Sequence, residues 1–174
     1  MTRWVTLLPL AAIVALALLF GIYGLHHNPH VEPHELVGKP MPDDALPSLD
    51  DGRQVKLREL VKDGPVVVNF FASWCGPCQV EEPTLMALKA KKVPIVGIAY
   101  EDEPQNTQAF LNRLGDPFAV RLVDRHGRTG VDFGITGVPE TYLVGADGVI
   151  KKKWTGPLDD GDVEALARAT STAR

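Results

Sequence analysis

The first part of the sequence lacks charged residues. Residues 4–25 contain no Asp, Glu, Lys or Arg. A membrane-spanning helix needs about 20 apolar residues, whereas the apolar part of a cleaved signal peptide has about 7–15. A small-residue cleavage motif, Ala15-Leu16-Ala17, is present, but it lies inside the apolar run. We expect residues 1–25 to form an uncleaved membrane anchor, with removal as a signal peptide as the alternative.

Basic residues are scarce around this run. Arg3 is the only one before it, and Lys39 is the first one after it. Because positive charge favours the cytoplasmic side of a membrane, this pattern predicts that the rest of the chain is exported.

The whole chain has 18 Lys and Arg against 22 Asp and Glu, with no basic stripe, so a nucleic-acid partner is not expected.

Internal repeats and low-complexity tracts are also absent. Residues 26–45 are rich in Pro and His without periodicity, which is typical of a linker. The residues after it are enough for one buried core and too few for two. We therefore predict a membrane anchor at 1–25, a linker at 26–45 and one domain at 46–174.

Strand and helix patterns alternate within the domain. The expected strands cover residues 46–49, 54–57, 66–72, 95–100, 119–123, 141–144 and 149–154. The expected helices cover residues 75–91, 107–114 and 162–169. The first helix is expected to bury Val80, Leu85, Met86 and Leu88, which share an apolar face. This order is typical of an α/β fold with a mixed sheet and helices on both faces.

The chain has only two cysteines, Cys75 and Cys78, and they stand three positions apart. A disulfide that closes so small a loop constrains the unfolded chain very little. The pair directly follows an expected strand and opens an expected helix, whose free N–H groups and dipole stabilise a thiolate. This position predicts a redox dithiol in which Cys75 is the nucleophile and the more shielded Cys78 is the resolving thiol.

A metal site and an inert disulfide are the alternatives for this pair. Zinc would need two further ligands at matching spacing, but there is no second cysteine pair and His126 stands alone. Four linker histidines, His26, His27, His30 and His34, are expected to be solvated, with transient copper or zinc binding as the alternative. We predict no metal site and no cofactor.

The segments 36–49, 66–83 and 93–150, together with the apolar run, resemble the thioredoxin superfamily. The resemblance is to the membrane-anchored thiol:disulfide interchange proteins of cytochrome c biogenesis, the CcmG/DsbE type. It covers nearly the whole chain, and the block from residue 93 is more specific than the four-residue cysteine motif. It implies a thioredoxin-like fold, a central mixed β-sheet flanked by helices, with an N-terminal β extension, an insertion within residues 101–133 and a transmembrane helix.

The resemblance also implies a substrate-binding surface around the dithiol. Its members are Trp74, Gly76, Pro77, Val138 and Pro139. By resemblance the Val138–Pro139 bond is cis and packs against the cysteines, which leaves the Val138 backbone free to pair with a substrate strand.

Acidic residues near the dithiol separate this chain from thioredoxin itself. Asn69 stands where thioredoxins carry a buried aspartate, and an amide does not titrate. Glu81 and Glu140 match the anchored branch and are expected to relay protons and to tune the thiol pKa values, with solvated surface acids as the alternative.

Five other residues are expected to have structural roles or to face solvent. Glu82 is expected to face solvent, and Lys151–Lys153 is expected to be a solvated run that protects an edge strand. Trp154 is expected in the core.

The expected function is reduction of disulfides outside the cytoplasm. By resemblance the substrate is apocytochrome c before haem attachment, or the partner is the haem-ligation machinery, and electrons come from a membrane thiol transporter. The expected location is the bacterial inner membrane, single-pass, with the catalytic domain on the periplasmic side. A less specialised anchored disulfide reductase and a thiol metallochaperone remain as alternatives.

Overall fold

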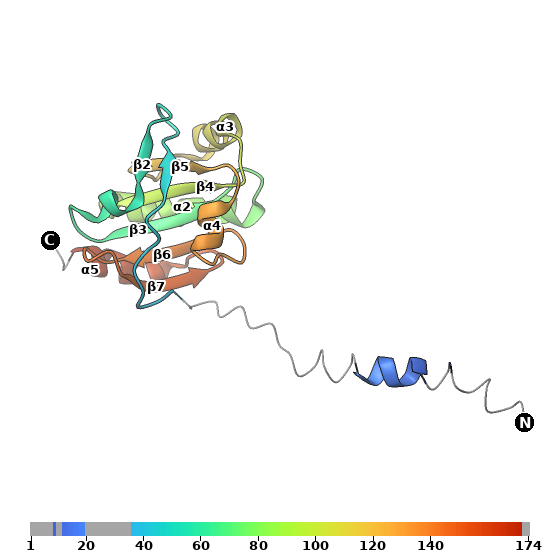
Figure 1. Ribbon diagram of the computed structural model, residues 1–174. Helices are drawn as coiled ribbons and strands as arrows, with labels where there is room; N and C mark the ends of the chain where they lie inside the picture. The colour runs from blue at the N-terminus through green and yellow to red at the C-terminus, as the bar shows by residue number, and fades with distance from the viewer. Residues whose placement is uncertain (1–8, 10–11, 20–35, 172–174) are drawn as a thin grey trace, which may run out of the picture. The chain divides into compact units, whose positions relative to one another are not determined.

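The computed structural model describes residue 9, residues 12–19 and residues 36–171, which fall into two separate units (Figure 1). Residues 12–19 are helical and lie within the predicted anchor. The rest of that prediction, and the four linker histidines, lie outside the described residues. In the parts of the chain that are described, no helix combines the length and the apolar character needed to span a membrane.

A five-stranded sheet in the order β5-β4-β3-β6-β7 forms the centre of the second unit. Three strands run parallel: β3 (Val66–Phe71), β4 (Ile95–Tyr100) and β5 (Val120–Asp124). The other two, β6 (Glu140–Val144) and β7 (Ile150–Thr155), pair antiparallel with β3 and with each other. This arrangement confirms the predicted mixed sheet. All of β3 is buried because its β-branched and aromatic residues are covered on both faces.

Three helices contribute to the core on one face of the sheet. They are α2 (Gly76–Ala90), α3 (Pro104–Leu114) and α5 (Asp160–Ser171). Their side chains pack with sheet residues such as Val67 and Phe71, and both cysteines belong to this core. The predicted helices are therefore confirmed, and α3 begins at Pro104, three residues earlier than expected, because proline suits the first turn.

Smaller elements cover the other face. They are the hairpin of β1 (Ala45–Pro47) and β2 (Gln54–Lys56), the 3₁₀ helix η1 (Leu57–Val61) and the short helix α4 (Arg128–Asp132). The hairpin confirms the predicted N-terminal β extension, and its turn contains Gly52 with a φ of 72°. The segment 36–45 of the predicted linker lies on the domain, where Gly38 donates to the Ile150 carbonyl and Met41 is buried.

The buried face of α2 differs from the prediction. Leu85 and Leu88 are buried as expected, but Val80 is 73% exposed and Met86 is 37% exposed. The face that packs onto the sheet instead contains Cys78, Glu81 and Glu82. The buried face of α2 is therefore rotated relative to the apolar pattern, and it includes Cys78.

Candidate active site

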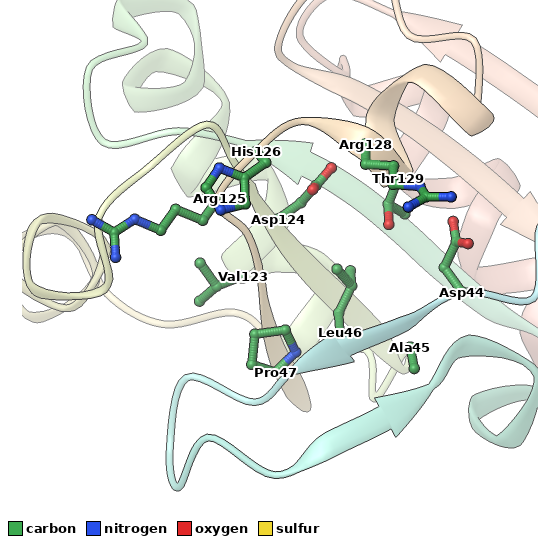
Figure 2. Close-up of a pocket in the computed structure, with 10 residues that line it drawn as sticks. All are labelled: Asp44, Ala45, Leu46, Pro47, Val123, Asp124, Arg125, His126, Arg128 and Thr129. Atoms are coloured by element: carbon green, nitrogen blue, oxygen red, sulfur yellow. The ribbon is translucent and has the colours of Figure 1, made fainter.

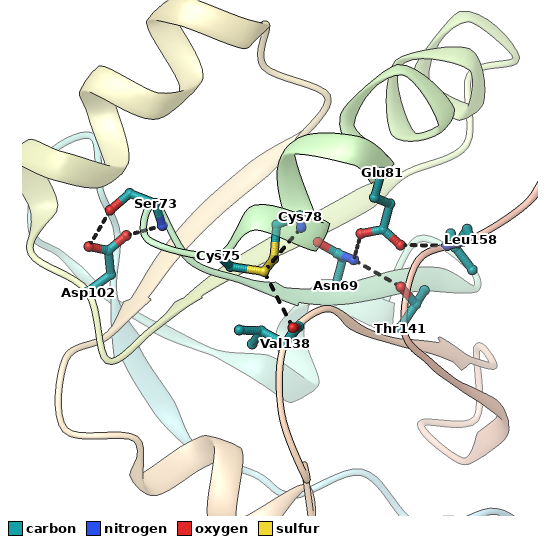
Figure 3. The surroundings of a disulfide bond; sticks show 9 residues. All are labelled: Asn69, Ser73, Cys75, Cys78, Glu81, Asp102, Val138, Thr141 and Leu158. Atoms are coloured by element: carbon teal, nitrogen blue, oxygen red, sulfur yellow. Dashed lines mark hydrogen bonds between the residues drawn. A yellow bond between two sulfur atoms is a disulfide. The ribbon is translucent and has the colours of Figure 1, made fainter.

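A disulfide joins Cys75 and Cys78 at the start of α2 (Figure 3). Cys75 is the N-cap residue, and its Sγ accepts a hydrogen bond from the Cys78 backbone N–H at 3.1 Å. Pro77 lies in the first helical turn, where a missing N–H costs nothing. A thiolate on Cys75 would therefore receive a backbone N–H and the positive end of the helix dipole, and both favour the charged form.

The two cysteines do not differ in exposure as predicted. Cys75 is 3% exposed and Cys78 is 2% exposed, whereas Gly76 and Pro77 between them are exposed. Both sulfur-bearing side chains pack into the helix-covered core in the oxidised protein. Capping position, rather than accessibility, thus favours Cys75 over Cys78 as the expected nucleophile.

The Val138–Pro139 peptide bond is cis, as the resemblance implied. Its carbonyl side lies against the dithiol, with the Val138 oxygen 3.4 Å from Cys75 Sγ. In the disulfide this sulfur has no proton, so the approach is a packing contact, and a reduced Cys75 thiol in this place would have an acceptor for its proton. Val138 is half-buried and Pro139 is buried.

Asp102 anchors the loop that precedes the cysteines. Its carboxylate accepts hydrogen bonds from the Ser73 backbone N–H at 2.7 Å and from the Ser73 hydroxyl at 2.8 Å. Next to it, Trp74 donates from Nε1 to the Glu101 carbonyl at 3.2 Å, and 59% of Trp74 remains exposed. Trp74 is thus held beside the dithiol as an exposed aromatic surface, in the position that a substrate-facing residue requires.

Asn69 and Glu81 meet beneath the disulfide. The Asn69 Nδ2 donates to Glu81 Oε2 at 3.0 Å and to Thr141 Oγ1 at 2.9 Å. The Leu158 backbone N–H donates to Glu81 Oε1 at 3.0 Å. Asn69 and Glu81 are both buried. The structure therefore places Glu81 on the face of α2 that carries Cys78, as its spacing predicted.

Burial raises the pKa of Glu81 to about 7, while the hydrogen bonds from Leu158 and Asn69 act in the opposite direction. A carboxyl group with this pKa exchanges protons readily near neutral pH. This property matches the proton relay that the sequence predicted for Glu81.

The prediction for Glu82 is wrong, because this residue is only 3% exposed. Burial, with the nearby charges of Asp116 and Glu81, raises the pKa of Glu82 to about 7. Sequence pattern alone favoured solvent, since a glutamate is rarely buried without a partner.

Glu140 lies on the other face of the sheet. Its carboxylate accepts from the backbone and hydroxyl of Thr136 and from the Tyr142 hydroxyl, and forms an ion pair with Lys153 Nζ at 2.7 Å. It pairs in register with Phe70, whereas Asn69 pairs with Thr141, and side chains alternate between the faces. The structure thus brings Glu81 close to the dithiol and places Glu140 in a separate polar cluster.

The lysine run on β7 is only partly solvated. Lys151 and Lys152 are exposed as predicted, but Lys153 is 5% exposed and donates to the Gly134 carbonyl as well as pairing with Glu140. The prediction is wrong for Lys153 because a buried carboxylate requires a cation. Trp154 is half-buried at the core edge, with Nε1 donating to Asp162.

A pocket of about 460 Å³ lies between the hairpin and the β5–α4 connection (Figure 2). Its lining includes Asp44, Asp124 and His126, and neither cysteine. Asp124 accepts from the Gly130 backbone N–H at the start of α4, and burial raises its pKa. Among the residues that the structure describes, no three His, Cys, Asp or Glu side chains form a cluster suited to a metal ion.

The raised pKa of Glu81 predicts a pH-dependent stability. Glu81 binds its proton more tightly in the folded state than in the unfolded chain, where its pKa is near the ordinary 4.5. Its contribution is therefore fully favourable below about pH 4.5 and is lost as pH rises through 7, at a cost of about 3 kcal/mol at most. Urea unfolding of the oxidised protein between pH 5 and 8.5 measures this loss.

The matched variants for that measurement are Glu81→Gln and Glu59→Gln. Glu59 is exposed, so its replacement should leave the change of unfolding free energy with pH as it is in wild type. Glu81→Gln should gain stability relative to wild type as pH rises. If the unfolding free energies of wild type and Glu81→Gln changed in parallel with pH, that result would contradict a raised pKa at Glu81.

Comparisons with known proteins agree with this geometry. The Redoxin family model matches residues 36–169. The chain is 39% identical over 154 residues to the thiol:disulfide interchange protein DsbE of Allochromatium vinosum, covering 88% of this chain and 84% of that protein. It is 36% identical over 143 residues to the thiol:disulfide interchange protein HelX of Rhodobacter capsulatus, covering 80% of each.

A solved structure shows the same fold. The crystal structure of a putative thiol:disulfide interchange protein DsbE from Chlorobium tepidum matches with a TM-score of 0.64 and 30% identity. The match covers 76% of this chain and 94% of that one. The fold is therefore thioredoxin-like, as the resemblance implied.

Proposed function

The chain belongs to the Redoxin family and is a thiol:disulfide oxidoreductase, and from this premise we propose that it reduces disulfides of apocytochrome c before haem attachment. The observation that carries the proposal is the redox pair Cys75–Cys78 at the start of α2, with the carbonyl oxygen of the cis Val138–Pro139 bond beside Cys75 Sγ. The resemblance of the segment 93–150 to the proteins of cytochrome c biogenesis supports the choice of substrate.

Electron flow towards the substrate is supported by the residues between the cysteines. Gly76 and Pro77 match thioredoxin, which is a strong reductant with a potential of about −270 mV. Apocytochrome c carries its haem-attachment cysteines in a C-x-x-C-H motif, and these cysteines must be thiols before haem is joined. A reductant is therefore the activity that this substrate needs in an oxidising compartment.

Reduction proceeds in two exchange steps. The Cys75 thiolate attacks one sulfur of the substrate disulfide, forms a mixed disulfide and releases the other substrate sulfur as a thiolate. Cys78 then loses its proton and attacks Cys75 Sγ, which releases the second substrate thiolate. Two electrons pass to the substrate, and the protein returns to the disulfide form that the structure shows.

Glu81 is the acceptor of the Cys78 proton in this scheme. It occupies the next turn of α2 and is held by Asn69 and Leu158. The disulfide is then reduced again by a membrane thiol transporter, which supplies electrons from the cytoplasm. The uncharged run at 4–25 supports an anchor in the bacterial inner membrane with the domain in the periplasm.

Trapping in the host tests the choice of substrate. A Cys78→Ser protein lacks the resolving thiol, so it should accumulate mixed disulfides with apocytochromes c, identified by mass spectrometry after alkylation. The double variant Cys75→Ser/Cys78→Ser is the control and should trap none. Recovery of only other envelope proteins, together with normal c-type cytochromes in a deletion strain, would instead indicate a general disulfide reductase.

A further inference from the structure

Two carboxyl groups, rather than one, lie below the dithiol on α2. Glu81 and Glu82 follow Cys78 by three and four positions, so both lie on the next helical turn and on the same side of the helix. Both are buried where an amphipathic helix would present apolar side chains to a sheet. Burying a second carboxyl group costs free energy of folding. The burial of Glu82 therefore indicates that this carboxyl group has a function.

Glu82 differs from Glu81 in its hydrogen bonding. Both carboxylate oxygens of Glu81 accept bonds, from Asn69 and from Leu158. By contrast, Oε1 of Glu82 is buried and has no hydrogen-bond partner within the described part of the chain. A buried oxygen left unpaired is costly, and a protonated carboxyl group reduces this cost because it is uncharged.

Glu82 is also the member of the pair whose pKa responds to the charge of a loop residue. Asp116, in the connection between α3 and β5, acts electrostatically on Glu82, and its side chain is 28% exposed. Arg121 pairs with the Asp116 carboxylate at 2.8 Å, and Lys89 donates to the Asp116 carbonyl. Glu81 is thus held by hydrogen bonds from Asn69 and Leu158, whereas Glu82 is under the electrostatic influence of a partly exposed loop residue.

We propose that Glu82 carries protons between Glu81 and solvent during thiol–disulfide exchange. This inference rests on the exchange scheme given above. Glu82 touches no reacting atom and acts through Glu81, so it is a positioning residue for the proton.

The proposed role of Glu82 follows from the path of the proton in the resolving step. Cys78 gives its proton to the Glu81 carboxylate, and the resulting Cys78 thiolate attacks Cys75 Sγ while the substrate thiolate leaves. Glu81 then gives the proton to the Glu82 carboxylate, and Glu82 gives it to water beside Asp116. Both carboxyl groups end the cycle in their starting state, and the departing thiolate takes its own proton from water.

The test follows the resolving step in the reduced full-length protein with oxidised glutathione as the disulfide. Rapid acid quenching and mass spectrometry separate the glutathione mixed disulfide from the resolved Cys75–Cys78 form. Glu82→Gln should slow resolution about tenfold. Glu82→Ala, which leaves space at this buried position, should be slow as well, and added imidazole, a small base, should restore its rate and leave wild type unchanged.

A second variant tests the same role without altering α2. Burial is the main cause of the raised pKa of Glu82, and the negative charge of Asp116 adds to it. Asp116→Asn removes that charge, so the pH midpoint of the resolving rate should move to lower pH. Glu59→Gln, an exposed change elsewhere, is the control for both variants. Thermal melting checks that each variant is folded.

Three outcomes would overturn the inference. They are a Glu82→Gln rate equal to that of the control, a slow Glu82→Ala rate that imidazole does not restore, and an unmoved midpoint in Asp116→Asn. If wild type itself fails to reduce oxidised glutathione through Cys75, then the exchange scheme fails rather than the role of Glu82.

Discussion

Replacing Cys75 with Ser is expected to lower the rate of disulfide reduction about 1000-fold or more. Cys75 is the N-cap of α2, and its sulfur alone receives both the Cys78 N–H and the end of the helix dipole. A serine hydroxyl at this place does not ionise near neutral pH and does not exchange with disulfides. The rate is measured with a disulfide peptide under single-turnover conditions.

Replacing Cys78 with Ser should give a different defect. The first attack should stay within about tenfold of wild type, because Cys75 keeps its cap position, and the mixed disulfide should then accumulate. Peptide covalently bound per protein distinguishes the two variants, since Cys78→Ser stops at the mixed disulfide and Cys75→Ser should form none. Equal loss of the first attack in both variants would contradict the assignment of Cys75 as the nucleophile.

Replacing Lys153 with Met should destabilise the protein by about 3–5 kcal/mol. Lys153 is almost completely buried, and its ammonium group pairs with Glu140 and lies 5.3 Å from the centre of the Tyr142 ring. Its loss leaves the Glu140 carboxylate buried without a cation. Urea unfolding at pH 7 measures the change in the free energy of unfolding.

Two further variants separate a buried ion pair from a general loss of packing. Lys151→Met removes an exposed lysine that pairs with Asp147, and it should change stability by less than about 0.5 kcal/mol. The double variant Glu140→Gln/Lys153→Met should recover part of the stability that Lys153→Met loses. A double variant less stable than Lys153→Met would show that the pair does not account for the effect.

The chemistry of the site was largely predictable from the sequence. Cys75 follows a strand and precedes a helix with a proline in its first turn. All of these features lie within one short stretch of sequence, so the sequence alone identifies the dithiol. The three-residue spacing also brought Glu81 to the same face as Cys78, where it meets Asn69. The cis bond at Pro139 came from the family resemblance, since no local pattern specifies it.

The burial of charged side chains was not predictable in the same way. Glu82 and Lys153 look like solvent residues in sequence, and both are buried. Lys153 finds its partners, Glu140 and the Gly134 carbonyl, at a distance in the chain. The apolar pattern of α2 favoured Val80 and Met86, but placement of the cysteines decides which face is buried. The periodicity of apolar residues indicates which face of a helix is usually buried. Tertiary contacts override this tendency where a site requires buried polar groups.

Asp102 was missed for a related reason. It stands in an acidic run, Glu101-Asp102-Glu103, that reads as a solvated loop. The parallel pairing of β3 and β4 was the available signal, because it brings the loops after both strands to one edge of the sheet. Applied to Ser73 and Asp102, that rule predicts their contact.

The central claim is that the Cys75–Cys78 dithiol reduces a haem-attachment disulfide directly. The most direct measurement mixes the reduced protein with a peptide whose Cys-x-x-Cys-His motif is oxidised, and then quenches, alkylates and weighs both partners. We predict that one Cys75–Cys78 disulfide forms for each peptide disulfide that is reduced. A peptide that stays oxidised while the protein keeps both thiols would contradict the account.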